Sequence, residues 1–403
     1  MPLTIFLITY FGIALGKVPG LVIDRVGIAL LGAIAMVGFD VVSTQSAVQS
    51  IDLPTILLLY SLMIISAQLR LGGFYTWAAS RIVTLLAKPK AFLLVLMTAS
   101  AVMSALLAND IVCFAFTPVL TTALMRSGMN PLPFLLGLAV SSNIGSAATI
   151  IGNPQNMLIG QVGQLAFDRF IVWCAPPAII SLAGSYLILL RLYRGRMILG
   201  ETCPTAGDPN AWPDFNPWQS TKGIAAAIGL VVLFFSPLPR EVSAIAIAGI
   251  LLCSRRMRTR DILGLVDWHL ITLFCALFIV IHGITQAYDL NLVVNRLAGW
   301  GMNLGNLAIL TTLTVVLSNI FSNVPAVMLM IPFMDPKAPQ QWYTLALSST
   351  FAGNLFVLGS IANLIVIEQA SRLGVTISFR EHARVGAPVT LMSLIVLVVW
   401  GMI

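Results

Sequence analysis

The chain has 403 residues, of which 58% are hydrophobic and only 9% are charged. A soluble globular protein carries about 25% charged residues, so this composition excludes that class and indicates a polytopic membrane protein. The formal net charge of +7 would suggest a nucleic-acid partner in a soluble chain. Here the basic residues instead follow the predicted membrane spans, and we expect no nucleic acid.

Apolar runs long enough to cross, or nearly cross, about 30 Å of hydrocarbon follow one another along the chain. We expect about ten such spans, at 3–16, 21–38, 52–69, 132–158, 170–190, 221–236, 239–253, 267–284, 341–370 and 386–403. Two further runs, 91–125 and 307–334, are broken midway by Asn-containing motifs. We expect each to be a re-entrant hairpin with arms of about fifteen to seventeen residues, too short for comfortable crossings. The first run has no basic region before it, which predicts a retained span rather than a signal peptide.

The basic residues predict the orientation of these spans. If the chain changes sides at every crossing and each broken run returns to its own side, 18 of the 22 Lys and Arg residues fall on one face. The four on the other face are Arg169, Arg240, Arg296 and Lys337. Positive-inside orientation makes the more basic face cytoplasmic and puts both termini outside. The polar, proline-rich stretch 195–220 is then a cytoplasmic linker. We therefore expect a multi-pass protein of the cell (inner) membrane, with the lipid bilayer as its surroundings.

The two ends of the chain resemble each other. Ser104, Asn109 and Pro118 recur 214 residues later, and a second set recurs at an offset of 207 residues. The pairs are Ser104 with Ser318, Asn109 with Asn323, Pro118 with Pro332, Gly152 with Gly359 and Asn156 with Asn363. Residues 1–194 and 221–403 each contain five crossings and one hairpin. Because five is odd, the second half enters the membrane upside down, and the predicted fold is an all-α inverted repeat of five transmembrane helices plus one hairpin.

The first hairpin tip carries Ala108-Asn109-Asp110, and Asp110 is the one acid that we place deep in the membrane. A lone carboxylate in hydrocarbon costs several kcal/mol and survives by binding a cation, by protonation or by facing water. A protonated Asp that simply bonds to a neighbouring helix is the alternative. The second tip, Ser322-Asn323-Val324-Pro325, has no charge. A kink without a ligand is the alternative there.

Two spans also contain Gly, Asn and Pro clusters, which predict unwound segments at 143–156 and 350–363. Unwinding frees backbone carbonyls that can bind a cation. Small residues also serve close helix packing. Helix packing does not explain why amide side chains would lie deep in the membrane, where they need hydrogen-bond partners. These side chains are Asn143, Asn153, Asn156, Asn354 and Asn363.

These motifs together resemble the ion transporter superfamily, whose members include arsenite permeases, sodium/proton antiporters and divalent-anion/sodium symporters. The resemblance runs over nearly the whole chain, and the Ala108-Asn109-Asp110 form is most similar to the arsenite permease and anion permease branch. It implies an elevator-type motion of a part holding both hairpins, cation sites at the hairpin tips and, in some members, homodimers. In dicarboxylate symporters the sequence at both hairpin tips resembles Ser-Asn-Thr. This chain departs from that pattern, because Asp110 and Val324 stand at the third position.

The sequence therefore predicts a secondary transporter of a small anion or oxyanion, arsenite-like, coupled to a proton or sodium gradient, with no other cofactor. The alternatives are a sodium/proton antiporter, a sodium-coupled di- or tricarboxylate symporter, and a channel. We find no HExxH or GxSxG motif, so an enzyme is not expected. The candidate substrate- and ion-binding residues are Ser104, Asn109, Asp110, Asn143, Gly145, Asn153, Asn156, Ser318, Ser322, Asn323, Asn354 and Asn363, with sodium, if it is the coupling ion, at Asn109, Asp110 and Asn323.

Overall fold

The computed structural model describes residues 1–16, 20–198, 214–289 and 301–402, together with residues 292, 296 and 299. This part of the chain is helical and contains no β-strand, which confirms the all-α prediction. Five of its helices are long and apolar enough to cross a membrane, and they are Leu53–Leu71, Pro89–Leu106, Phe167–Leu192, Trp268–Ala287 and Phe379–Trp400. Several shorter apolar helices accompany them.

The helices of residues 1–198 run in the order α1 (Pro2–Leu15), α2 (Arg25–Gly38), α3 (Thr44–Ser50), α4 (Leu53–Leu71), α5 (Phe74–Val83), α6 (Pro89–Leu106), α7 (Asn109–Arg126), α8 (Pro131–Ser146), α9 (Pro154–Val162) and α10 (Phe167–Leu192). Those from residue 214 onward are α11 (Pro217–Leu233), α12 (Arg240–Leu252), α13 (Thr259–Leu263), α14 (Trp268–Ala287), α16 (Leu307–Phe321), α17 (Asn323–Met330), the 3-10 turn η2 (Ile331–Phe333), α18 (Pro339–Ala352), η3 (Val357–Gly359), α19 (Ile361–Arg372) and α20 (Phe379–Trp400).

Two aspartates start corresponding helices in the same way. Asp52 caps α4, where its carboxylate accepts the backbone N–H of Thr55 at 2.9 Å. Asp267 caps α14, where it accepts the N–H of Leu270 at 2.9 Å. Such caps satisfy backbone donors that a helix start leaves open. The two residues stand 215 apart in the sequence, so the resemblance between the two ends extends to local geometry.

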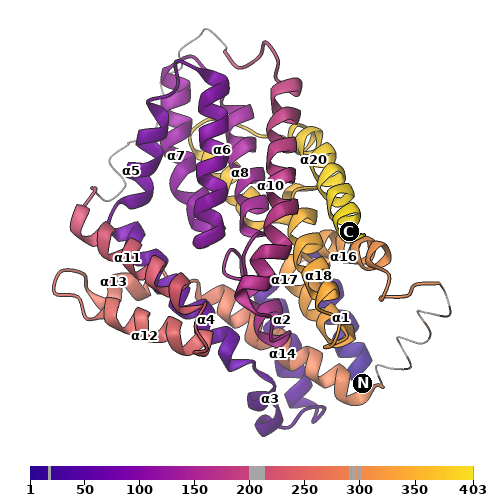
Figure 1. Ribbon diagram of the computed structural model, residues 1–403. Coiled ribbons are helices and arrows are strands. Elements are labelled where there is room, and N and C mark those ends of the chain that lie inside the picture. The colour runs from indigo at the N-terminus through magenta and orange to yellow at the C-terminus, as the bar shows by residue number, and fades with distance from the viewer. Residues whose placement is uncertain are drawn as a thin grey trace.

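The helices form two groups that pack side by side. One group, the scaffold set, contains α1–α4 and α11–α14. The other, the hairpin set, contains α5–α10 and α16–α20 (Figure 1). Within the scaffold set the contacts cross between the two ends of the chain, because α12 and α11 pack on α4 while α2 and α1 pack on α14. The scaffold set therefore needs helices from both halves of the sequence.

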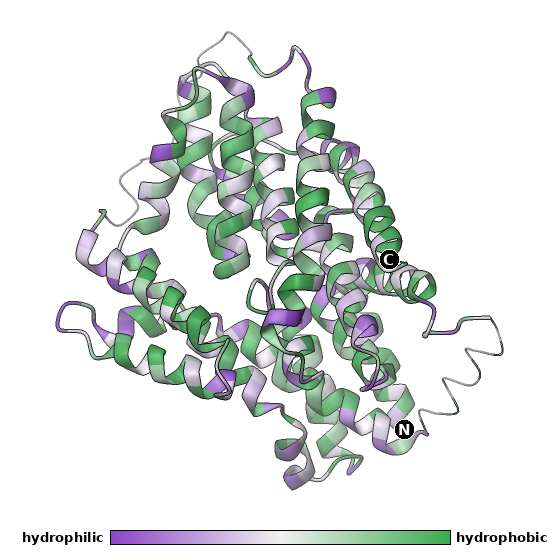
Figure 2. Cartoon of the chain, in the orientation of Figure 1, coloured by the Kyte–Doolittle hydropathy of each residue, from purple (hydrophilic) through white to green (hydrophobic). Residues whose placement is uncertain are grey.

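The outer surface of the molecule is apolar. Figure 2 shows hydrophobic residues along the outer faces of the helices and hydrophilic ones mostly near helix ends and loops. Large apolar side chains such as Phe11, Val172 and Ile250 are between 66% and 72% exposed. Exposed apolar surface on this scale suits hydrocarbon rather than water, in agreement with a multi-pass membrane protein.

Two expectations about boundaries need correction. The arms of the first hairpin, α6 and α7, have 18 residues each, longer than we expected, and α6 alone is long enough to span. The predicted apolar run begins at residue 91, whereas α6 begins at Pro89. A proline is accepted at the first position of a helix, because no N–H is needed there. The expected linker 195–220 also ends early, since Asn216 caps α11. Residues 199–213 of this linker lie outside the described residues.

Close contact between α6 and α8 depends on Gly145. A Cβ atom added there would lie 2.2 Å from the carbonyl oxygen of Ala101, a backbone atom that cannot move aside. We expect Gly145→Ala to destabilise the protein by about 1–3 kcal/mol, as overpacking does, measured as a lower Tm of the purified protein. Gly249→Ala in α12 is the matched control, because a Cβ there meets nothing within 4 Å. Equal Tm values for the two variants would contradict this account.

Candidate functional site

Four helices begin at interruptions in the hairpin set. α7 begins at Asn109 after the first hairpin turn, and α17 begins at Asn323 after the second. α9 follows a break at residues 147–153, and α19 follows a break at 353–360. Both breaks fall inside the segments for which the sequence predicted unwinding. Asn, Gly and Pro produce them because they favour caps and turns over continuous helix.

The first residues of these four helices surround one small cavity of about 30 Å³, which we call the central cavity. Its volume is enough for one or two groups of the size of a water molecule. Its lining residues are Asn109, Asp110, Asn143, Asn153, Pro154, Gln155, Leu270, Ser322, Asn323, Val324, Ser360 and Ile361. The two hairpin tips and the two breaks, which are distant in sequence, therefore meet at one point.

Helix dipoles set the electrostatics of the central cavity. The N-terminus of a helix carries roughly +0.5 elementary charge and presents free N–H groups. Four N-termini at one point favour an anion or the oxygen atoms of an acid. Asp110, in the first turn of α7, is the single acidic residue that lines the cavity. The positive helix N-termini thus offset the negative charge of the Asp110 carboxylate. The remaining volume of the central cavity can take the oxygen atom of a ligand.

Asn143 of α8 connects both halves of the chain. Its side chain is only 2% exposed. Its Nδ2 donates to Oδ1 of Asn354 at 3.0 Å and of Asn363 at 3.2 Å. Its Oδ1 accepts from the Ser360 hydroxyl at 2.8 Å and from Nδ2 of Asn109 at 3.3 Å. One amide therefore ties the first hairpin tip to the second break.

The two breaks are held by equivalent hydrogen bonds. Nδ2 of Asn156 donates to the carbonyls of Ser146 at 3.3 Å and of Thr149 at 3.0 Å. Nδ2 of Asn363 donates to the carbonyls of Gly353 at 2.8 Å and of Phe356 at 3.3 Å. Each residue of the second set lies 207 positions after its counterpart. These amides satisfy the carbonyls that unwinding would otherwise leave open.

Ser360 was missed by the sequence prediction, although it lines the central cavity. It caps α19, where its hydroxyl oxygen accepts the N–H of Ala362 at 3.2 Å. Asn153 caps α9 in the same manner and accepts the N–H of Asn156 at 2.9 Å. The two caps are 207 residues apart. The repeat offset that paired Asn156 with Asn363 could therefore have identified Ser360.

Half of the predicted site residues line the central cavity, and half do not. The lining residues are Asn109, Asp110, Asn143, Asn153, Ser322 and Asn323. The others do not line it, and they are Ser104, Gly145, Asn156, Ser318, Asn354 and Asn363. Asn354 and Asn363 bond to the lining residue Asn143. Ser104 bonds to the Ser142 hydroxyl at 2.8 Å, and Ser142 donates to the carbonyl of Asn109 at 3.2 Å. This pair of serines fixes the backbone of the first tip.

The second tip is strained and incompletely bonded. Ser322 has φ 77° and ψ 163°, a region that only glycine adopts easily. Asn323 is 8% exposed, and its Oδ1 has no hydrogen-bond partner in the described part of the chain. The same is true of Nδ2 of Asn354 and of the hydroxyl of Ser318. Buried polar atoms normally find partners. Of these three residues only Asn323 lines the central cavity, so its open oxygen is the one that a ligand in the cavity could reach.

A second cavity of about 180 Å³, the lateral cavity, shares Asp110, Pro154 and Leu270 with the central cavity. Its polar lining residues are Asp110, Asp267 at the start of α14 and Arg70 at the end of α4. The Arg70 guanidinium lies 4.6 Å from the centre of the Phe114 ring. Asp110 therefore borders both cavities, and the lateral cavity also contacts the scaffold set.

Paired interrupted helices that meet at a polar cavity inside an apolar-surfaced helical protein define a membrane transporter. A family model described as citrate transporter (CitMHS) matches residues 10–352, most of the chain. The chain belongs to this family, within the anion permease type of the ion transporter superfamily. Its relatives are transporters and not enzymes, as the sequence indicated.

Individual relatives cover nearly the full length of the chain. A "46 kDa membrane protein" of Mycobacterium leprae is 30% identical over 97% of this chain and 95% of its own. The silicon efflux transporter LSI3 of rice is 28% identical over 93% and 92%, and the putative transporter arsB of Dictyostelium discoideum is 24% identical over 93% and 86%. The crystal structure of the YdaH transporter of Alcanivorax borkumensis covers all of this chain and 96% of its own, with TM-score 0.59 and 16% identity. That last likeness shows the fold alone.

Proposed function

We propose that this protein is a secondary active transporter that moves a small anion or oxyacid, arsenite-like, across the membrane in exchange for, or together with, a proton or sodium ion. The observation that carries the proposal is the central cavity, where four helix N-termini meet and one of them carries Asp110. N-termini bind oxygen-bearing ligands. A membrane-embedded carboxylate is suited to carry a coupling cation.

The charge around the site favours a neutral or singly charged substrate. Among the residues that line the two cavities, Asp110 and Asp267 are acidic and Arg70 alone is basic. A tricarboxylate such as citrate would bring three further negative charges beside two carboxylates, which is costly in a poorly hydrated site. We therefore favour a weak oxyacid such as arsenous or silicic acid. The name of the rice relative, a silicon efflux transporter, agrees with this choice.

Coupling is proposed to occur at Asp110. A proton would bind the carboxylate directly, whereas sodium would also need oxygen ligands from Asn109 and Asn323 across the central cavity. The unpartnered Oδ1 of Asn323 is available for such a role. We further propose that the halves are inverted repeats and that the hairpin set moves against the scaffold set, so that Asp110 alternates between the two faces.

The proposal is tested with purified protein in liposomes. We expect arsenite, antimonite or silicic acid to be taken up at least about fivefold faster with an imposed proton or sodium gradient than without one. Citrate and succinate serve as the comparison substrates. Uptake of the carboxylates alone, driven by sodium, would establish the symporter alternative. Sodium-dependent proton flux with no effect of any of these substrates would establish the antiporter alternative, and either result would overturn the proposal.

A further inference from the structure

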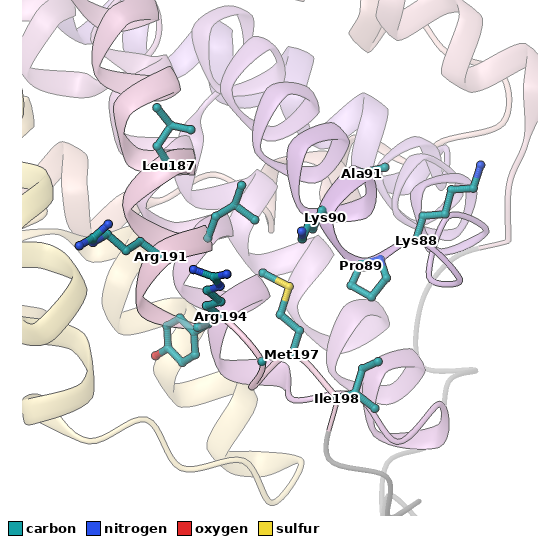
Figure 3. Close-up of a pocket in the computed structure, with 12 residues that line it drawn as sticks. Lys88, Pro89, Lys90, Ala91, Leu187, Arg191, Arg194, Met197 and Ile198 are labelled. Carbon is teal, nitrogen blue, oxygen red and sulfur yellow. The ribbon is translucent and has the colours of Figure 1, made fainter.

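A large cavity far from the hairpin tips opens between the start of α6 and the end of α10 (Figure 3). Its volume is about 970 Å³. Four basic residues line it, and we call it the basic cavity. They are Lys88, Lys90, Arg191 and Arg194. None of the twelve lining residues is acidic, so the cavity concentrates positive charge from two segments about one hundred residues apart.

The four cations are available to a ligand. All four side chains are exposed, and none forms an ion pair within the described part of the chain. The nearby acid Glu381 is engaged by Tyr193, whose hydroxyl donates to Oε2 at 3.1 Å. Burial, with Glu381 as a second cause, raises the pKa of the Tyr193 phenol well above its usual range, so it remains a neutral donor.

The start of α6 adds to the positive potential. Lys88 caps this 18-residue helix without a side-chain hydrogen bond, and its first turn contains no acid. The first N–H groups of α6 are therefore open to an anion beside Lys90. In Figure 3, Lys90 and Arg194 lie between Lys88 and Arg191.

Apolar surface adjoins these charges. Leu187, Leu190 and Met197 line the same cavity, and Leu187 is 63% exposed on the outer side of α10. The positive-inside count places all four basic residues on the cytoplasmic face, at the ends of membrane-crossing helices. A free anion would use the charges but not the apolar surface, whereas a phospholipid uses both.

We propose that the basic cavity binds the phosphate headgroup of an anionic phospholipid from the cytoplasmic leaflet, with its acyl chains along Leu187. The four side chains hold the phosphate, and the start of α6 completes the anion site. This lipid site is separate from the central cavity and does not depend on the identity of the transported substrate.

Binding can be measured by native mass spectrometry of purified, delipidated protein titrated with phosphatidylglycerol or phosphatidylcholine. We expect one tight phosphatidylglycerol site that phosphatidylcholine does not fill. The cavity variant replaces its four basic residues with Gln. Because each juxtamembrane charge is worth about 1 kcal/mol, affinity should fall roughly 100- to 1,000-fold.

The matched control removes the same charge from the same predicted face, outside the basic cavity. Its four exposed positions are Arg255, Arg256, Arg258 and Arg260, each replaced with Gln. We expect this control to retain the tight site. Equal loss in both variants would show a non-specific charge effect and overturn the proposal. Displacement of the lipid by millimolar inorganic phosphate would show a site for a soluble anion, with the same consequence. A Tm comparison in detergent checks that both variants are folded.

Discussion

Asp110→Asn is expected to lower gradient-driven transport at least about fivefold, to the rate seen without a gradient, and to remove its dependence on pH. The substitution keeps the shape of the side chain but removes the carboxylate that borders both cavities. Free energy coupled between an ion and a substrate commonly amounts to 1–3 kcal/mol, which gives a change of this size. The measurement is initial uptake into liposomes over a series of imposed pH and sodium gradients.

Asp52→Asn is the matched control for this experiment. It makes the same chemical change at the cap of α4, where Asn caps equally well, and it does not border either cavity. We expect its transport to match that of the unaltered protein. If Asp110→Asn retained coupled uptake with its pH dependence, the role assigned to Asp110 would be wrong. A correctly folded variant is distinguished from a misfolded one by its Tm.

Asn143→Ala is expected to cost about 2–5 kcal/mol of stability and to abolish transport. The side chain is buried and bonds to four residues, and its removal leaves several buried polar groups without partners. Thermal unfolding and liposome uptake measure the two effects. Part of the loss should be shared with Ser360→Ala in a double-mutant cycle, because the two side chains bond at 2.8 Å.

Asn130→Ala provides the control on the same helix. Asn130 caps the opposite end of α8, where its Oδ1 accepts the N–H of Leu132 at 3.1 Å. Its Nδ2 also donates to the carbonyl of Arg196 at 2.8 Å. Loss of the cap and of this hydrogen bond costs about 1–2 kcal/mol, and the central cavity is untouched. Transport should therefore survive in Asn130→Ala. Similar stability and transport in the two variants would refute the claim that Asn143 ties the halves together.

The sequence indicated the positions of the breaks because Gly, Asn and Pro are conspicuous within apolar runs. The repeat also paired Asn109 with Asn323 and so indicated both hairpin tips as parts of the site. The sequence could not reveal Asn143 as the central connection, since three of its four partners lie more than 200 residues away. Leu270 also lines the central cavity, and a leucine within an apolar span gives no sign of a site. Folding in three dimensions decides which ordinary side chains face a cavity.

The basic cavity shows the same limit. Lys88 and Arg191 were counted on the cytoplasmic face, yet nothing in the charge count indicates that they line one cavity. The inverted orientation of the halves stays a prediction. The paired caps Asp52 and Asp267, and the paired amides Asn156 and Asn363, are what such a duplication would leave in local geometry.

The crossed packing of the scaffold set has a consequence for synthesis of the protein. Gln68 of α4 is fully buried, and its Nε2 donates to the carbonyl and side-chain oxygens of Gln219, 151 residues later. At about 5–20 residues per second, a ribosome needs roughly 8–30 s to produce that partner. During this interval α4 sits in the membrane with a polar amide and an uncovered face. We therefore expect the first half to be an incomplete folding unit, because α11 and α12 pack on α4 only after they have been synthesised.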